Sequence, residues 1–167
     1  KNEGDAIILI GEQQNDIASS EYLHKLRGVE FSPAPHFDID EEFAVQKFVS
    51  SLIHSKLISS AHDISEGGLA VTLLEKGFNR ELGFDVAANT DLRKDAFWFG
   101  EAQSRVVVSC NQEQVEQIRQ RAASANIPVT ILGTVTGGYI KVNGESWNNT
   151  LSWKEKYNTA IENILNA

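Results

Sequence analysis

One segment of the sequence combines residue types that bind phosphate and metal ions: Ser60-Ala61-His62-Asp63-Ile64-Ser65-Glu66-Gly67-Gly68-Leu69-Ala70. Gly67 and Gly68 remove two side chains where a ligand could approach the backbone. A helix that begins there offers unpaired N–H groups and the positive end of its dipole, which suit a phosphate or a carboxylate. Asp63 could coordinate Mg²⁺, which prefers carboxylate and phosphate oxygens, and Ser65 could donate to a phosphate oxygen.

The same segment has a structural interpretation. Ser65 could be the N-cap of an ordinary helix, with Gly68 allowing close packing. No Lys-Ser/Thr pair follows the glycines, so the segment is not a Walker loop. Side chains alternate along a strand, so His62 should face away from Asp63 and pack against the fold.

A second segment carries fewer chemical groups: Phe97-Trp98-Phe99-Gly100-Glu101-Ala102-Gln103-Ser104-Arg105. In a functional interpretation Glu101 is another metal ligand and the Gly100 backbone lies close to a nucleotide. In the alternative, Glu101 and Arg105 pair with each other at the surface. The three aromatic residues form either part of the core or a face that meets other domains.

The elements that must position these segments alternate between strand and helix, which indicates a layered α/β domain. Strands are expected at 5–12, 57–64, 83–87, 104–109, 129–135 and 139–142, and helices at 20–26 and 67–78. Gly137-Gly138 predicts a hairpin between the last two strands, which makes the sheet mixed.

Three further helices have start signals of the capping-box type. These signals are Asp38 with Glu41, Asn111 with Gln114, and Ser152 with Glu155. The last helix should have one apolar side, formed by Trp153, Tyr157, Ile161, Ile164 and Leu165.

Composition bounds the class of protein. The 167 residues suffice for one domain with a real core, and the net charge of −8 leaves no basic face for nucleic acid or an anionic membrane. The single cysteine, Cys110, cannot form an internal disulfide, so a cytoplasmic location and an inert thiol are expected. The sequence contains no methionine, which fits a piece of a longer chain.

Two blocks, SSAHDISEGGLAVTLLEKGF and FGEAQSRVVVS, carry a family resemblance. With the upstream run EGDAIILIGEQQNDIASSEYLHKLRG they resemble the last domain of the synthetase subunit of phosphoribosylformylglycinamidine synthases, in the aminoimidazole ribonucleotide synthetase-like superfamily. The sequence departs from the family at Ala18-Ser19-Ser20-Glu21-Tyr22, where relatives often carry Gly-Gly-Ser-Glu-Tyr.

The resemblance implies a fold and an activity. The fold is a three-layer α/β/α domain with a mixed sheet, partly ferredoxin-like, in which residues 1–167 form one C-terminal-type ATP-binding half of a larger synthase. The activity is ATP- and ammonia-dependent conversion of formylglycinamide ribonucleotide to its amidine. The implied partners are the N-terminal domains of the parent chain, a glutaminase subunit and the small-molecule substrate.

The resemblance also assigns residues. Asp63 falls at a nucleotide or Mg²⁺ position, with Ser65, Gly67 and Gly68 near the phosphates. Gly100 lies against ATP, Glu101 near Mg²⁺, and Gln103 or Ser104 approaches the substrate. The family's catalytic histidine lies in another domain, so no catalytic residue is expected here.

Two alternatives stay open at this point. The domain could be a non-catalytic module whose bound nucleotide braces the fold or an interface. The related aminoimidazole ribonucleotide and selenophosphate synthetases are disfavoured because they do not usually combine both motifs.

Overall fold

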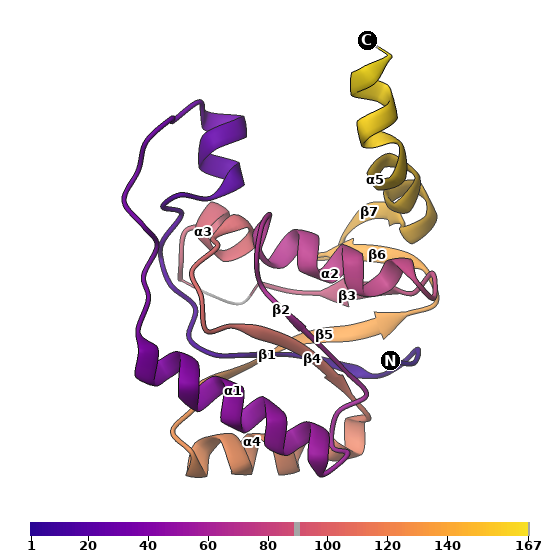
Figure 1. Ribbon diagram of the computed structural model, residues 1–167. Coiled ribbons are helices and arrows are strands. Elements are labelled where there is room, and N and C mark those ends of the chain that lie inside the picture. Colours follow the sequence, from indigo (N-terminus) through magenta and orange to yellow (C-terminus); the bar gives the residue numbers. More distant parts are fainter. Residues whose placement is uncertain (89–90, 167) are drawn as a thin grey trace.

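Seven strands form one mixed sheet in the order β2-β4-β1-β5-β3-β6-β7 (Figure 1). The computed structural model describes residues 1–88 and 91–166. The strands are β1 (Ala6–Ile10), β2 (Ser60–Asp63), β3 (Gly83–Val86), β4 (Val106–Cys110), β5 (Val129–Thr136), β6 (Tyr139–Val142) and β7 (Glu145–Asn149). The α-helices are α1 (Ile39–His54), α2 (Gly68–Phe78), α3 (Lys94–Phe99), α4 (Val115–Ser124) and α5 (Thr150–Leu165). Two short helical turns are η1 (Tyr22–Leu26) and η2 (Gln112–Gln114).

Four of the seven strands have ferredoxin-like topology. The units β1-α1-β2 and β4-α4-β5 interlock to give the order β2-β4-β1-β5, with every neighbouring pair antiparallel. This is the arrangement of a split β-α-β motif. The ferredoxin-like component expected from the sequence is therefore confirmed.

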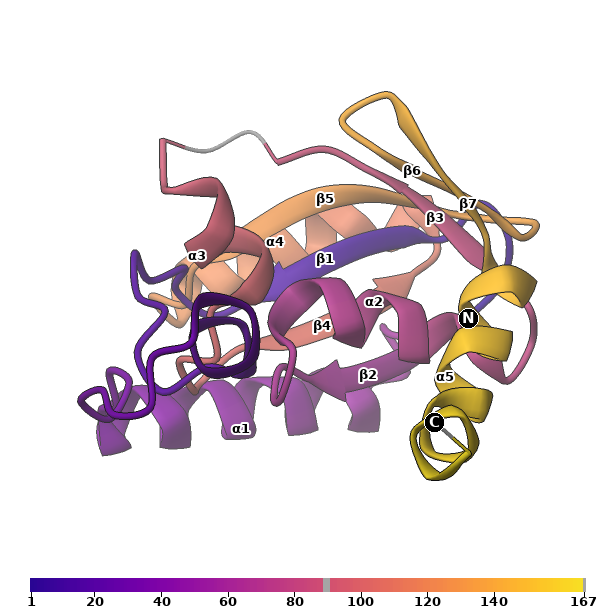
Figure 2. The ribbon, with the colours of Figure 1, turned by 90° about the horizontal axis from the view of Figure 1, so that it is seen from above.

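The burial of the central strand β1 shows that helices cover both faces of the sheet, which gives three layers. All five residues of β1 are buried and apolar, because the sheet is covered on both faces. Ile7 and Leu9 belong to a core cluster with residues of α2 and α3, whereas Ile8 and Ile10 belong to a second cluster under α1 and α4. Viewed from above, α2 and α3 cross one face of the sheet and α1 and α4 lie behind it (Figure 2).

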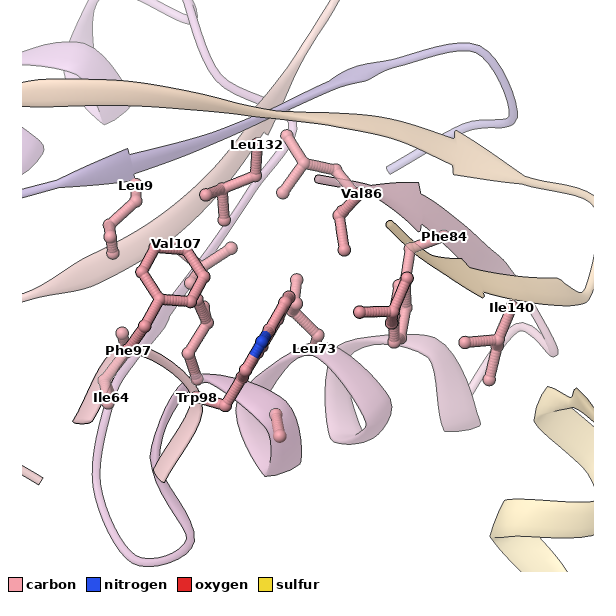
Figure 3. Close-up of a cluster of buried hydrophobic side chains, with 14 of the residues drawn as sticks. Leu9, Ile64, Leu73, Phe84, Val86, Phe97, Trp98, Val107, Leu132 and Ile140 are labelled. Atoms are coloured by element: carbon pink, nitrogen blue, oxygen red, sulfur yellow. The ribbon is translucent and has the colours of Figure 1, made fainter. Parts of the chain in front are cut away.

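The aromatic residues of α3 fill the first of these clusters. Phe97 and Trp98 point toward the sheet, near Leu9 and Val107 (Figure 3). Their rings meet edge to face, with centroids 4.8 Å apart. Of the two interpretations that the sequence left open for these aromatics, the core interpretation holds for Phe97 and Trp98.

The expected hairpin at Gly137-Gly138 is wrong. Strand β3 lies between β5 and β6, antiparallel to β5 and parallel to β6. The true hairpin joins β6 to β7 through Asn143 and Gly144, which have φ angles of +52° and +81°. Asn-Gly is the preferred pair for a two-residue hairpin turn. The sheet is mixed as predicted, but its parallel pair is β3 with β6.

The last helix also differs from expectation. Its N-cap is Asn149, whose side chain accepts the N–H of Ser152, so the expected cap at Ser152 is wrong. Trp153 packs against the core, but Ile161, Ile164 and Leu165 are exposed. Figure 1 shows why: α5 extends away from the sheet and leaves the second half of its apolar side uncovered. The other two start signals hold, at Asp38 and Asn111.

Within the described residues no helix is long and apolar enough to cross a membrane. Cys110 is fully buried at the end of β4, and burial raises the pKa of its thiol to about 11. A thiol in this environment is not a nucleophile at neutral pH, which agrees with the inert residue expected from the sequence.

Candidate functional site

A cavity of about 320 Å³ lies where β2 and β4 meet the first turn of α1. It is lined by Glu42, Val45, Gln46, Asp63, Ile64, Ser65, Glu66, Glu101, Gln103, Ser104, Arg105 and Val106. The structure therefore brings five predicted site residues together in one cavity, from segments about 40 residues apart in the sequence: Asp63, Ser65, Glu101, Gln103 and Ser104. Strand pairing causes this, because Asp63 at the end of β2 lies opposite Val106 at the start of β4.

Asp63 offers an exposed carboxylate to the cavity. Its side chain is 76% exposed, and Oδ1 lies 3.7 Å from Nδ1 of His62. His62 is half-buried and its Nε2 lies 3.7 Å from a carboxylate oxygen of Glu75 on α2. His62 thus packs beside α2, as expected, but it does not face away from Asp63, whose carboxylate lies beside its ring and remains exposed.

The turn at Gly67 and Gly68 requires glycines because of its backbone conformation and its packing. Gly67 and Gly68 have φ angles of +81° and +67°, and Gly67 is the N-cap of α2, so Ser65 does not cap the helix. A Cβ on Gly68 would lie 2.8 Å from backbone atoms of Phe99 and Trp98. The absence of a side chain at Gly68 is therefore required by contact with α3.

Glu101 makes contacts that the sequence did not reveal. Its Oε1 accepts the backbone N–H of Gly67 and that of Glu21, each at 2.8 Å. The Gly67 N–H expected to meet a phosphate thus donates to a carboxylate of the same chain. The alternative in which Glu101 pairs with Arg105 at the surface is not among the ion pairs of the described residues, because Arg105 is only 2% exposed and donates elsewhere.

Arg105 is the buried cation of the site. Its Nε donates to the carbonyl oxygen of Ala102, one Nη to that of Gly100, and the other to Oε1 of Gln13. Burial lowers the pKa of the guanidinium to about 10, while the charges of Asp16 and Glu101 act in the opposite direction. Arg105 remains charged at neutral pH.

Ser104 has a strained backbone. Its φ angle is +62°, a region that a non-glycine residue rarely adopts and that is common at functional sites. Its hydroxyl donates to Glu42 Oε2 at 2.7 Å, and Glu42 Oε1 accepts from Gln46. Glu42 and Gln46 are site residues that the sequence did not indicate, because an exposed polar pair four apart on a helix is typical of a solvated face.

Gly100 does not line the cavity. A Cβ there would lie 2.5 Å from the carbonyl oxygens of Ala96 and Asp16. Asp16 belongs to residues 12–38, which we call the arm. The arm therefore packs directly against this glycine. Tyr22 of the arm also stacks on Phe99, with ring centroids 5.0 Å apart.

The departure from the family pattern in the arm falls at a special conformation. Ser19 has a φ angle of +51°, and it occupies the place of the second glycine of the Gly-Gly-Ser-Glu-Tyr run. Its hydroxyl donates to the carbonyl oxygen of Pro33 at 2.8 Å, which links two parts of the arm that are 14 residues apart in the sequence. The left-handed backbone explains why a glycine suits this position.

Two carboxylates that the sequence suggested as metal ligands, Asp63 and Glu101, both line the cavity. Asp63 and Glu101 supply carboxylate oxygens, the ligand type that Mg²⁺ prefers. No three of the described His, Cys, Asp and Glu side chains form a group that could hold a metal ion. This chain alone therefore does not complete a metal centre, and no chemical step is assigned to one.

The family of AIR synthase related proteins, C-terminal domain, matches residues 2–144. The chain belongs to this family. It is 40% identical over 142 residues to the phosphoribosylformylglycinamidine synthase subunit PurL of Alkaliphilus metalliredigens, an alignment that covers 85% of this chain and 19% of that protein. The chain thus spans about a fifth of the length of that relative.

Solved structures agree on the fold of this family member. PurL of T. maritima in complex with FGAR superimposes with a TM-score of 0.72 at 14% identity, over 92% of this chain and 28% of that one. The same protein in complex with ATP gives a TM-score of 0.65 at 13% identity, over 87% and 24%. The three-layer mixed-sheet fold expected from the sequence is confirmed.

Proposed function

We propose that this chain, residues 1–167, is the C-terminal ATP-binding domain of a phosphoribosylformylglycinamidine synthase synthetase subunit. The parent enzyme is an ATP-dependent ligase of purine biosynthesis that converts formylglycinamide ribonucleotide to its amidine with ammonia. The observation that carries the proposal is the convergence of both family motifs on one cavity. The 40% identity to a PurL subunit and the FGAR and ATP complexes of a protein with the same fold support it.

In this proposal the cavity meets the phosphates of ATP and the substrate. Asp63 and Glu101 supply oxygens to Mg²⁺, and Ser65 with the Gly67-Gly68 turn lies near the phosphates. Gly100 does not line the cavity, so its place against ATP rests on the family motif alone, and Gln103 and Ser104 face the substrate. Phosphoryl transfer depends mainly on positioning and charge stabilisation, so a domain of this kind contributes without a catalytic residue of its own.

The carboxylates of the cavity favour a metal–nucleotide complex over a bare anion. Glu42, Asp63, Glu66 and Glu101 all line it, against one buried guanidinium. A phosphate without a counter-ion would be repelled by this set, whereas a Mg²⁺-bound phosphate brings the compensating charge.

The chain supplies only part of the site. The N-terminal domains of the parent chain complete it, and a glutaminase subunit in the same cytoplasmic assembly delivers ammonia. We therefore expect no synthase turnover from the 167-residue chain alone. Turnover by the pure chain would contradict this expectation.

The decisive experiment is ATP- and ammonia-dependent turnover of the parent chain carrying Asp63→Asn, beside the unmutated protein. The amide keeps the size of the side chain but removes the charge that a metal ion needs, so turnover should fall at least about 100-fold at unchanged thermal stability. Asp91→Asn is the matched control, because Asp91 is an exposed aspartate that does not line the cavity.

In the second candidate function, the domain is non-catalytic and its bound nucleotide only stabilises the fold or an interface. In that case Asp63→Asn lowers the melting temperature in the presence of ATP and leaves turnover intact. The relatives found for this chain are synthetase subunits, which does not favour this candidate.

A further inference from the structure

The cavity contains a charged group to which neither the family motifs nor the proposed function gives a role. Arg105 follows Ser104 in the sequence, and its guanidinium is almost completely buried. The ion pairs among the described residues include none to Arg105. A buried charge without a carboxylate partner is costly unless its hydrogen bonds do something for the fold or the site.

Two of its three hydrogen bonds go to the residues on either side of Glu101. The guanidinium donates to the carbonyl oxygens of Gly100 at 2.7 Å and Ala102 at 2.9 Å, the residues on either side of Glu101. Because a guanidinium is planar and its donors have fixed directions, two such bonds fix the backbone between them. The third bond, to Gln13 Oε1 at 3.1 Å, holds the start of the arm against the same group.

Glu101 in turn joins two further segments. Its Oε1 accepts from the Gly67 N–H in the glycine turn and from the Glu21 N–H in the arm. Both bonds are 2.8 Å long and use a charged acceptor, which makes them stronger than bonds between neutral groups. The Glu101 carboxylate can serve both amides only if the backbone of residues 100–102 is held in place.

We propose that Arg105 is a positioning residue: it holds the carbonyl groups on either side of Glu101 so that the Glu101 carboxylate fixes the Gly67 turn and the arm at the rim of the cavity. The inference rests on the proposed function in one respect. In that function, the arrangement presents Glu101 Oε2 and the glycine turn to a metal-bound phosphate. The positioning itself depends only on the contacts of this chain.

The test uses amide signals of the ¹⁵N-labelled 167-residue chain without nucleotide. In Arg105→Lys the charge is kept but the planar fork is lost. We expect hydrogen exchange at the Gly67 and Glu21 amides to accelerate by about tenfold or more, with unchanged exchange in β1 and β4. Glu101→Gln should move the same two amide proton signals upfield, and Arg105→Lys should add little in its presence, because both substitutions remove one linkage.

Arg119→Lys is the matched control. Arg119 is an exposed arginine of α4 with a surface contact to Glu116, and its replacement should leave both amides unchanged. Three results would overturn the proposal. They are native exchange of Gly67 and Glu21 in a folded Arg105→Lys chain, additive effects of the two substitutions, or an Arg105→Lys chain that does not fold, which would assign Arg105 to stability alone.

A titration of the same samples with ATP and Mg²⁺ separates this inference from the proposed function. If the two amides respond to Arg105→Lys but no signal near the cavity responds to MgATP, the positioning role stands and the nucleotide site of this chain falls. If MgATP binds the Arg105→Lys chain as tightly as the original, and the two amides are unchanged, the positioning role falls and the nucleotide site stands.

Discussion

At the scale of the residue, glycines in this chain have positive φ angles for two different reasons. Gly144 forms the hairpin turn between β6 and β7 with a φ angle of +81°, and nothing lies within 4 Å of a Cβ built there. Gly68 has a similar φ angle of +67°, but a Cβ would also meet the backbone of Phe99 and Trp98. The first glycine meets only a conformational demand, whereas the second meets a conformational and a steric one.

This difference predicts that alanine substitutions at the two glycines lower the free energy of unfolding by different amounts. Gly144→Ala should lower the free energy of unfolding by about 1 kcal/mol, the cost of a left-handed backbone for a residue with a Cβ. Gly68→Ala should lower it by about 2–4 kcal/mol, because α2 must also move away from α3. Urea denaturation of both variants measures the two costs. Equal losses would show that the close contact between α2 and α3 relaxes freely.

The buried ammonium group of Lys76 should make the stability of the fold depend on pH. Its Nζ donates to Ser60 Oγ at 2.8 Å, and burial, with a smaller effect of Lys1, lowers the pKa of its ammonium group to about 7. In the unfolded chain the group stays protonated up to its ordinary pKa of 10.5. Between these values the unfolded state binds more protons, so the free energy of unfolding rises with pH, by at most about 1.4 kcal/mol per pH unit.

The measurement is the unfolding free energy at several pH values between about 7 and 9. Lys76→Met removes the titrating group while keeping the length of the side chain, so its slope should be smaller than that of the original chain. Lys25→Met, at an exposed position of the arm, is the control and should keep the original slope. An unchanged slope in Lys76→Met would mean that water reaches this ammonium group in the folded protein.

The residues of the site were predictable to the extent that they lie in motifs. Asp63 ends a strand and Ser65 follows it, just before a glycine pair, so local chemistry identifies them. Glu42 was not predictable, because it reaches the cavity from α1 and only the packing of α1 on the sheet brings it near Ser104. For the same reason the sequence did not reveal that Arg105 is buried under the arm.

At the scale of the element, local signals fixed the positions of most helices and strands but not their neighbours. The Gly137-Gly138 pair predicted a hairpin because the pattern of two strands around a glycine turn is locally complete. Nothing local shows that β3, some 50 residues earlier, lies between those strands. The informative signal was Asn143-Gly144, which marks the hairpin that does form.

The start of α5 also could not be located from local sequence signals, and its observed cap leads to a prediction. The cap was expected at Ser152, but β7 delivers the chain to Asn149, whose side chain accepts the N–H of Ser152. Asn149→Ala should therefore cost about 1 kcal/mol of stability. Ser152→Ala should stay within about 0.5 kcal/mol of the original, as an ordinary exposed substitution does. Thermal unfolding of the two variants decides which residue is the cap.

At the scale of the whole molecule, one sheet serves two separate core clusters. Residues of α2 and α3 form one cluster with Ile7 and Leu9, and residues of α1 and α4 form the other with Ile8 and Ile10. Since neighbouring residues of β1 contribute to opposite clusters, β1 cannot leave one helical layer without leaving the other. Both clusters should therefore unfold in one transition.

The tryptophans allow this to be tested, because Trp98, Trp147 and Trp153 all lie in or against the α2–α3 cluster. Leu52 of α1 is fully buried in the other cluster, and Leu52→Ala should cost about 2–5 kcal/mol. If the layers are coupled, the tryptophan fluorescence midpoint in urea shifts as far as the circular dichroism midpoint. Ile53→Ala, at a neighbouring position that is 53% exposed, should shift both far less. A fluorescence midpoint that stays in place while the circular dichroism curve splits in two would show that the α1–α4 layer unfolds independently.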